Sequence, residues 1–210
     1  MRRRWLVLGL LAVVITLGMN SAVMANGPTA GRAGRSEVRF LEGMIDHHQM
    51  ALDMSNDCLN KAKTDTVLTM CRNIITAQTA EIKTMQGWLA SWYQISYSPV
   101  AMANNGMAGI QMGTAQPTAQ ATAAATPGLF TDPAQMMGMM AGLNRVQGRD
   151  YEIAWLESMI DHHDDAIHMS ERILKIAEHP ELRDMAQKII GDQGYEIQQM
   201  EALLVGFGDQ

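Results

Sequence analysis

Polar and apolar positions follow the 3.6-residue period of an amphipathic helix in four segments of the chain. This pattern predicts helices over residues 36–63, 65–93, 149–178 and 180–205. Ser36 is suited to cap the first of these helices, and Pro180 is suited to the first turn of the last. No segment has the strict alternation of a β-strand, so the sequence predicts an all-α fold.

Two stretches of the chain are nearly the same. Residues 41–55 read LEGMIDHHQMALDMS and residues 156–170 read LESMIDHHDDAIHMS, and the constant offset of 115 continues through the following helix. One helical hairpin cannot bury its apolar face alone, whereas two can form a four-helix bundle. We therefore expect hairpin repeats over 36–95 and 136–210, joined by a linker over 96–135 that is rich in Met, Ala, Thr and Pro.

The first 25 residues have the features of a cleaved signal peptide. The basic residues Arg2–Arg4 precede an apolar run of about a dozen residues, and a stretch of small residues ends at Ala25. The run is short for a membrane span, although an uncleaved anchor is the alternative. Cleavage would leave a flexible segment over 26–35 and no stable membrane anchor. The expected location is therefore the periplasm or the medium.

Charge and composition narrow the partners. The formal net charge is −6, and it becomes −9 without the three Arg of the leader. An acidic exported protein is a poor candidate for nucleic-acid binding. Met occurs 19 times, and this side chain either fills a core adaptably or offers a thioether that suits Cu(I). The Met-rich linker could collect metal, or it could be a disordered spacer.

The adjacent His residues of each repeat are expected to lie in different environments. On a helical wheel, His48 falls at the centre of the apolar face and His47 at its edge, whereas Asp46 points to water. The second copy gives the same result for His163 and His162. Two neighbouring residues diverge by about 100°, so both could bind one ion only with help from another helix.

The second helix of each hairpin carries buried polar residues. Gln78 and Glu81 fall within an apolar stripe, and a buried carboxylate without a partner is costly. In an oxidising compartment Cys58 and Cys71 are expected to form a disulfide, the alternative being a thiolate metal site. A disulfide at this position sets an antiparallel register in which His48 faces Glu81.

The same register can be applied to the second repeat. In the first repeat it also pairs Met44 with Met85. In the second repeat it pairs His163 with Glu196 and Met159 with Met200. Each hairpin would thus contain a Met–His–Glu–Met layer.

Two interpretations of this layer remain open. It could be a His–Glu hydrogen-bonded pair that fixes the register of the bundle. It could also be a metal site, because imidazole and thioether ligands together favour copper, especially Cu(I). His47 could then serve a flanking site with Met44, Met50 or Met54. The candidate metal ligands are His47, His48, His162, His163, Met44, Met54, Met85, Met159, Met169, Met200, Glu81 and Glu196.

These motifs resemble a secreted bacterial family catalogued as domain of unknown function 305. Its members carry one or two hairpins with Met-Ile-x-His-His-x-x-Ala-Ile-x-Met, followed by Gln-x-x-Glu-Ile-x-x-Met. Residues 44–54 and 78–85 carry these motifs here, and residues 159–169 and 193–200 carry them again. The resemblance implies a ferritin-like bundle and, by similarity to Met- and His-rich members, a periplasmic copper-binding protein.

Three functions are compatible with these observations. The first is a non-enzymatic metal-binding protein, for Cu(I) or silver, in periplasmic metal homeostasis or tolerance. The second is a metal-free structural or partner-binding bundle with buried His–Glu pairs. The third is a ferritin-like di-metal oxidase, which would use Glu-x-x-His on two helices. Ile45 occupies the position three before His48, so this chain lacks that spacing.

Overall fold

The computed structural model describes residues 27–99 and 133–208. The predicted signal peptide and most of the predicted linker lie outside these residues. Within the described residues the chain is helical and has no strand, which confirms the predicted all-α bundle. No helix in these ranges is both long enough and apolar enough to cross a bilayer.

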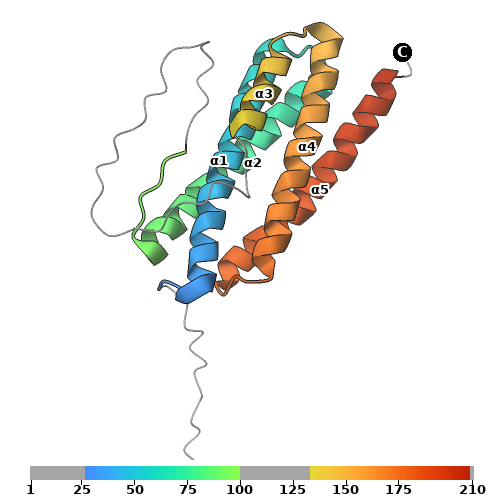
Figure 1. The fold of residues 1–210 in the computed structure, drawn as a ribbon. Coiled ribbons are helices and arrows are strands. Elements are labelled where there is room, and N and C mark those ends of the chain that lie inside the picture. The colour runs from blue at the N-terminus through green and yellow to red at the C-terminus, as the bar shows by residue number, and fades with distance from the viewer. Residues whose placement is uncertain (1–26, 100–132, 209–210) are drawn as a thin grey trace, which may run out of the picture.

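Five helices make up the described part of the chain (Figure 1). They are α1 (Gly31–Lys61), α2 (Asp65–Tyr93), α3 (Pro133–Leu143), α4 (Gly148–Leu174) and α5 (Pro180–Gly208). The prediction for α2 is confirmed at both ends. By contrast, α1 begins at Gly31, five residues upstream of the predicted cap Ser36. Ala30, whose backbone is extended, takes the N-cap position instead.

The short helix α3 was not predicted from the sequence. Its Met- and Gly-rich stretch lacks an amphipathic period, so nothing in its pattern marked a helix. In the structure it packs against α4 (Figure 1), and Met140 and Leu143 reach the core. Tertiary packing therefore stabilises this helix more than its own sequence does.

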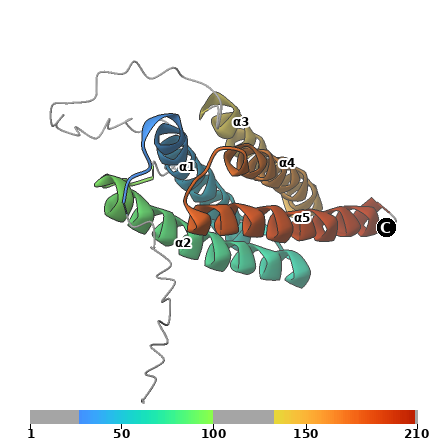
Figure 2. The ribbon, with the colours of Figure 1, turned by 90° about the horizontal axis from the view of Figure 1, so that it is seen from below.

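The bundle consists of two helical hairpins that meet through their first helices. α1 packs along α2, α4 packs along α5, and α1 also packs against α4 (Figures 1 and 2). A disulfide joins Cys58 to Cys71 with a Cα–Cα distance of 6.4 Å. The predicted disulfide is thus present, and the alternative of a thiolate metal site is wrong.

Polar residues divide the apolar core of the bundle into two clusters. The disulfide cluster includes Met50, Met54, Cys58, Cys71, Trp155, Met159 and Met200. The Trp92 cluster includes Phe40, Met44, Met85, Trp92, Met169 and Ile189. A polar motif in each long helix separates the two clusters: His-His in α1 and α4, and Gln-x-x-Glu in α2 and α5. We call the eight buried or half-buried residues of these motifs the polar layer: His47, His48, Gln78, Glu81, His162, His163, Gln193 and Glu196.

The order of the clusters gives the direction of the helices. α1 runs from the Trp92 cluster to the disulfide cluster, whereas α4 runs the opposite way. The two first helices are therefore antiparallel, and a pseudo-twofold axis passes through the polar layer. Residues 115 apart in sequence lie at equivalent positions on opposite sides of that axis.

A buried carboxylate of the second repeat holds the turn of the first. Glu152 is 3 % exposed. It accepts hydrogen bonds from the backbone N–H groups of Lys63 and Thr64 at 2.6 and 2.7 Å and from the Thr64 hydroxyl at 2.8 Å. These bonds satisfy donors at the start of α2 that have no partner within the helix.

Glu37, which lies 115 positions before Glu152, holds the turn of the second repeat. This buried carboxylate accepts bonds from the backbone N–H groups of Glu178 and His179 at 2.7 and 3.2 Å and from the His179 ring at 2.5 Å. The Tyr93 hydroxyl donates to it as well. Each repeat thus clamps the turn of the other, and the duplicated unit extends upstream of residue 41.

Candidate metal site

The predicted register of each hairpin is confirmed by the His–Glu pairs. His48 Nε2 lies 2.8 Å from Glu81 Oε2, and His163 Nε2 lies 2.7 Å from Glu196 Oε2. Burial raises the pKa of Glu81, but its bonds to His48 and Lys188 outweigh this effect and lower the pKa. Glu81 is therefore ionised at neutral pH, so the Nε2–H of His48 donates to it.

The prediction that His47 and His162 lie at the edge of the core is wrong. Both side chains are 1 % exposed, and their rings lie against each other across the pseudo-twofold axis, tilted by 35° with centroids 3.6 Å apart. His162 Nε2 donates to the His47 carbonyl at 2.8 Å. The wheel placed these residues at an edge because it treated a hairpin alone, whereas α1 and α4 bury a second face against each other.

Asp46 also departs from its predicted place. It is half-buried rather than directed into water. The hydroxyl of Tyr97, beyond the end of α2, donates to its carboxylate at 2.6 Å. This contact ties the segment after α2 back to α1, so the aspartate of the repeated motif has a structural role in the first copy.

The imidazoles of His47 and His162 are neutral at physiological pH. Burial lowers the pKa of His47 well below its usual 6.5, and the neighbouring imidazoles of His162, His48 and His163 lower it further. Burial likewise lowers the pKa of His162, despite its bond to the His47 carbonyl. A neutral imidazole carries a nitrogen lone pair, which is the form that binds metals.

Several ring nitrogens of the polar layer have no hydrogen-bond partner in the described structure. Both nitrogens of His47 are in this state, as is Nδ1 of His48, His162 and His163. Buried polar atoms are nearly always bonded, so a group of them in one layer calls for an explanation. Because His48 and His163 direct Nε2 at carboxylates, Nδ1 is the ring nitrogen that remains available to a ligand.

Predicted thioether ligands lie on both sides of the polar layer. Met44, Met85 and Met169 belong to the Trp92 cluster, whereas Met54, Met159 and Met200 belong to the disulfide cluster. The two sets are related by the 115-residue offset. Met44 and Met54 are ten residues apart on one helix, which corresponds to about 15 Å. They do not share a cluster, so they cannot both bind an ion at His47.

Oxygen and nitrogen ligands alone do not form a metal site here. Among the described residues, no three His, Cys, Asp or Glu side chains are placed to hold one ion together. The buried thioethers on either side of the polar layer are further potential ligands.

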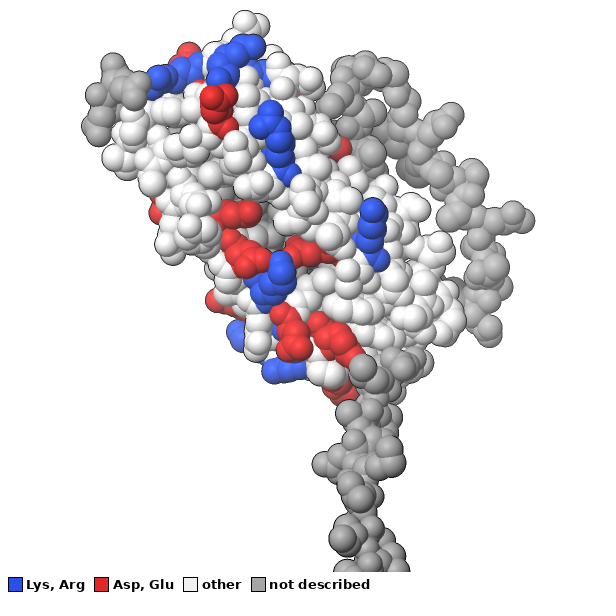
Figure 3. All heavy atoms as spheres, turned by 180° about the vertical axis from the view of Figure 1, so that it is seen from behind, with Lys and Arg blue, Asp and Glu red and all other residues white. Residues whose placement is uncertain are grey.

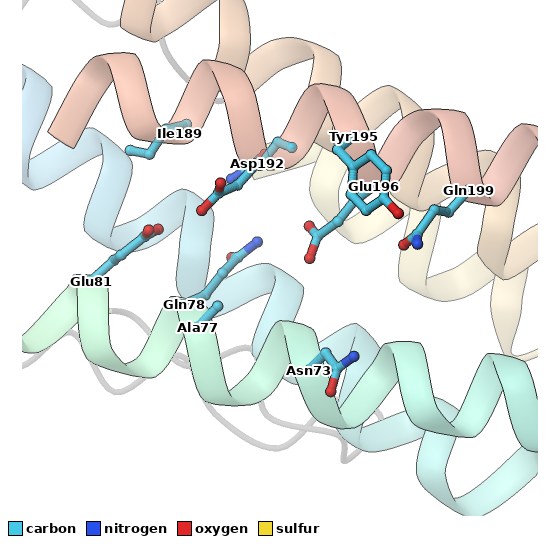
Figure 4. A pocket seen from close by; sticks show the side chains of 10 residues that line it. Asn73, Ala77, Gln78, Glu81, Ile189, Asp192, Tyr195, Glu196 and Gln199 are labelled. Atoms are coloured by element: carbon cyan, nitrogen blue, oxygen red, sulfur yellow. The ribbon is translucent and has the colours of Figure 1, made fainter. Parts of the chain in front are cut away.

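The polar layer reaches the surface between α2 and α5. A groove of about 280 Å³ lies there, and we call it the α2–α5 groove. Gln78 and Glu81 line it from α2, and Glu196 lines it from α5 (Figure 4). Gln193 of α5 is also part of its lining. Figure 3 shows this face of the molecule, where acidic side chains gather at mid-height with few basic ones between them.

Sequence reasoning missed one residue of this groove. Lys188 on α5 donates to Glu81 Oε1 at 3.1 Å and to Asp192 Oδ2 at 2.5 Å. It gives Glu81 a second partner, beside His48. No signal in the sequence pointed to this contact, because it joins α2 to α5, which belong to different repeats.

The fold and the polar layer define a class: all-α bundles built from two copies of one hairpin, with paired histidines at the centre. The chain belongs to the family described as domain of unknown function DUF305, whose sequence model matches residues 37–204. Among curated proteins, none matches this chain.

Solved structures with the same fold include copper complexes. CopM in its Cu(II)-bound form is 25 % identical, with a TM-score of 0.61 over 81 % of this chain and 97 % of that one. Its Cu(I)-bound form gives 26 % and 0.60 over 81 % and 96 %. A DUF305 fragment from Deinococcus radiodurans, 24 % identical with a TM-score of 0.61 over 84 % and 98 %, shares the fold.

Proposed function

We propose that this protein is an exported, non-enzymatic binder of Cu(I), or of silver in its place, that acts in periplasmic metal homeostasis or tolerance. The observation that carries the proposal is the arrangement of His48 and His163. Each donates a hydrogen bond from one ring N–H to a carboxylate, and its other ring nitrogen has no partner. Metal-binding histidines characteristically use this arrangement, because the carboxylate orients the ring and strengthens the ligand.

The ligands around the polar layer match a soft monovalent ion. Imidazole nitrogen and thioether sulfur are uncharged, and they select copper over hard ions such as Mg²⁺ or Ca²⁺. The carboxylates of Glu81 and Glu196 bond to the imidazoles of His48 and His163 and place negative charge next to them. This charge would offset part of the cost of holding a cation in a buried site.

The pseudo-twofold axis suggests two equivalent sites. One would combine imidazoles of the layer with Met44, Met85 and Met169. The other would combine them with Met54, Met159 and Met200, because these three form the equivalent set. Support from outside the chain comes from CopM, which has been solved with Cu(I) and Cu(II) bound.

A titration of the mature chain with Cu(I) against a competing Cu(I) chelator tests the proposal. The variant changes the four histidines of the layer to Gln, and its affinity is expected to fall at least 100-fold. Its control is His168→Gln, because His168 is an exposed imidazole on α4 outside the polar layer. Equal affinities of these two folded variants, with helicity checked by circular dichroism, would rule out the assigned site.

A metal-free structural bundle is the second candidate. It is favoured by the His–Glu pairs themselves, since ionised carboxylates with close partners can fix the register without any ligand. It predicts that the melting temperature of the mature chain is the same with and without Cu(I), Ag⁺, Zn²⁺ or Fe²⁺. A bound ligand must raise that temperature, because it binds only the folded state.

The proposed location has its own test. A cleaved leader predicts that the mature protein begins at Asn26 and is recovered from the periplasm or the medium. N-terminal sequencing after fractionation of the producing cells would give this residue. Recovery of the intact leader with the membrane fraction would instead support an uncleaved anchor.

A further inference from the structure

The α2–α5 groove contains polar side chains that no protein group satisfies. Gln78 is 2 % exposed and Gln193 is 3 % exposed, and both line the groove. Neither amide atom of Gln78 has a hydrogen-bond partner, and the Gln193 Oε1 atom has none. Buried amides without protein partners indicate that something else, a ligand or water, meets them from the groove.

The two ends of the groove differ in charge. At one end the Lys188 ammonium forms ion pairs with Glu81 and Asp192, so the carboxylate of Glu81 already has a cation of the protein beside it. The 115-residue offset places Asn73 at the equivalent position beside Glu196. In the described part of the chain, the ion pair of Glu196 is with His163, and no ammonium faces it.

The end at Glu196 is also the more open one. A second hollow of about 560 Å³ shares Asn73, Glu196 and Gln199 with the groove. The side chain of Glu196 is 21 % exposed, compared with 11 % for Glu81. A carboxylate that faces such a hollow, with no Lys or Arg paired to it in the described structure, attracts cations.

We propose that the Glu196 end of the groove is the port through which the metal cation reaches the polar layer, and that Lys188 closes the equivalent port at Glu81. This inference rests on the proposed function. Carboxylate and amide oxygens bind a soft ion weakly. They would therefore strip part of its hydration and pass it into the polar layer, where Nδ1 of His163 has no partner. Nε2 of the same ring lies 2.7 Å from Glu196.

The test measures how fast the mature chain takes up Ag⁺, a redox-inert monovalent probe, by stopped-flow tryptophan fluorescence. Trp155 reports the event, because it packs in the disulfide cluster with Met54 and Met159. Asn73→Lys places an ammonium at the open port. Its matched control, Asn56→Lys, makes the same change at an exposed position of α1.

At low ionic strength Asn73→Lys is expected to slow Ag⁺ association about fivefold or more, because electrostatic steering changes on-rates by tenfold and above. Asn56→Lys should stay within twofold of the native rate, and Lys188→Asn should speed association by opening the second port. Both added charges are equal, so equal rates for the two Lys variants would overturn the port.

The proposed function and the port fail in different ways. If the four-His variant binds Ag⁺ as well as the native chain, the polar layer is not the site and both proposals fall. If that variant loses binding while Asn73→Lys loads at the rate of Asn56→Lys, the site stands and the port is wrong.

Discussion

The clamp between the repeats gives a prediction whose size can be worked from the structure. Glu152 sits on α4 but binds the turn between α1 and α2, where it accepts three hydrogen bonds from Lys63 and Thr64. Glu152→Ala removes all three hydrogen bonds at once. It also leaves the two backbone N–H groups dependent on water.

The expected loss of stability is about 3 kcal/mol. A hydrogen bond to a charged group contributes about 1.5–3 kcal/mol when it is fully buried. Lys63 is exposed and Thr64 is half-buried, so water recovers part of each bond and about 1 kcal/mol per bond is a fair net value. Glu37→Ala should cost more, because its partner His179 is fully buried and water cannot replace the lost carboxylate.

The contribution of Glu152 to stability should also depend on pH. Burial raises the pKa of Glu152, but the bonds from Thr64 and Lys63 outweigh burial, so the pKa of the folded protein lies below the usual 4.5. A lowered carboxyl pKa contributes stability that is complete above about pH 4.5 and is lost as pH falls through the folded value. The difference in the free energy of unfolding between the native chain and Glu152→Gln should therefore become smaller below pH 4.5.

Urea unfolding followed by circular dichroism, at pH 7 and at pH 3.5, measures both effects. Glu157→Ala is the control, because Glu157 is an exposed carboxylate on the same helix, and exposed positions usually change stability by less than about 0.5 kcal/mol. If Glu152→Ala unfolds at the same urea concentration as Glu157→Ala, the clamp contributes nothing and the argument for it is wrong.

Three further predictions concern the core. Because the pKa values of His47 and His162 are lowered, the stability of the metal-free protein is complete above about pH 6.5 and falls below it by up to about 1.4 kcal/mol per pH unit for each ring. Urea titrations with chelator should show this slope, and changing both residues to Gln should flatten it. Cys58→Ala/Cys71→Ala should cost about 3 kcal/mol in the same assay, a loss that reduction of the native chain reproduces. Trp155→Phe removes a hydrogen bond to a main-chain carbonyl of α1 and should lower the unfolding free energy by about 1–2 kcal/mol.

The contacts within each hairpin could be predicted from the sequence. One expected disulfide, between Cys58 and Cys71, set the register of α1 against α2, and the offset of 115 carried that register to the second copy. The bonds from His48 to Glu81 and from His163 to Glu196 followed from it. This worked because an antiparallel hairpin with a short turn leaves little freedom of register.

The contacts between hairpins could not be predicted in the same way. A helical wheel shows which arc of a helix is apolar, but His47 lies on a second arc that only α4 buries. Lys188 is an exposed residue by pattern, and its contact with Glu81 depends on how α2 and α5 diverge. Glu37 and Glu152 carry a signal, since they are identical and 115 residues apart, but a single matching Glu upstream of the repeated motif does not indicate which turn it contacts.

Stability alone does not account for the buried polar residues of the polar layer. Replacing buried ionic groups with apolar residues of similar size is often neutral or stabilising, and an imidazole with two nitrogens lacking partners, as in His47, costs free energy in the metal-free fold. Residues at the edges of the layer differ between the copies, as Lys188 and Asn73 do. The His-His pair, the Gln and the Glu are the same in both copies. A group that costs free energy in the metal-free fold and is identical in both halves fits the metal site proposed above, because a ligand that binds only the folded state stabilises it.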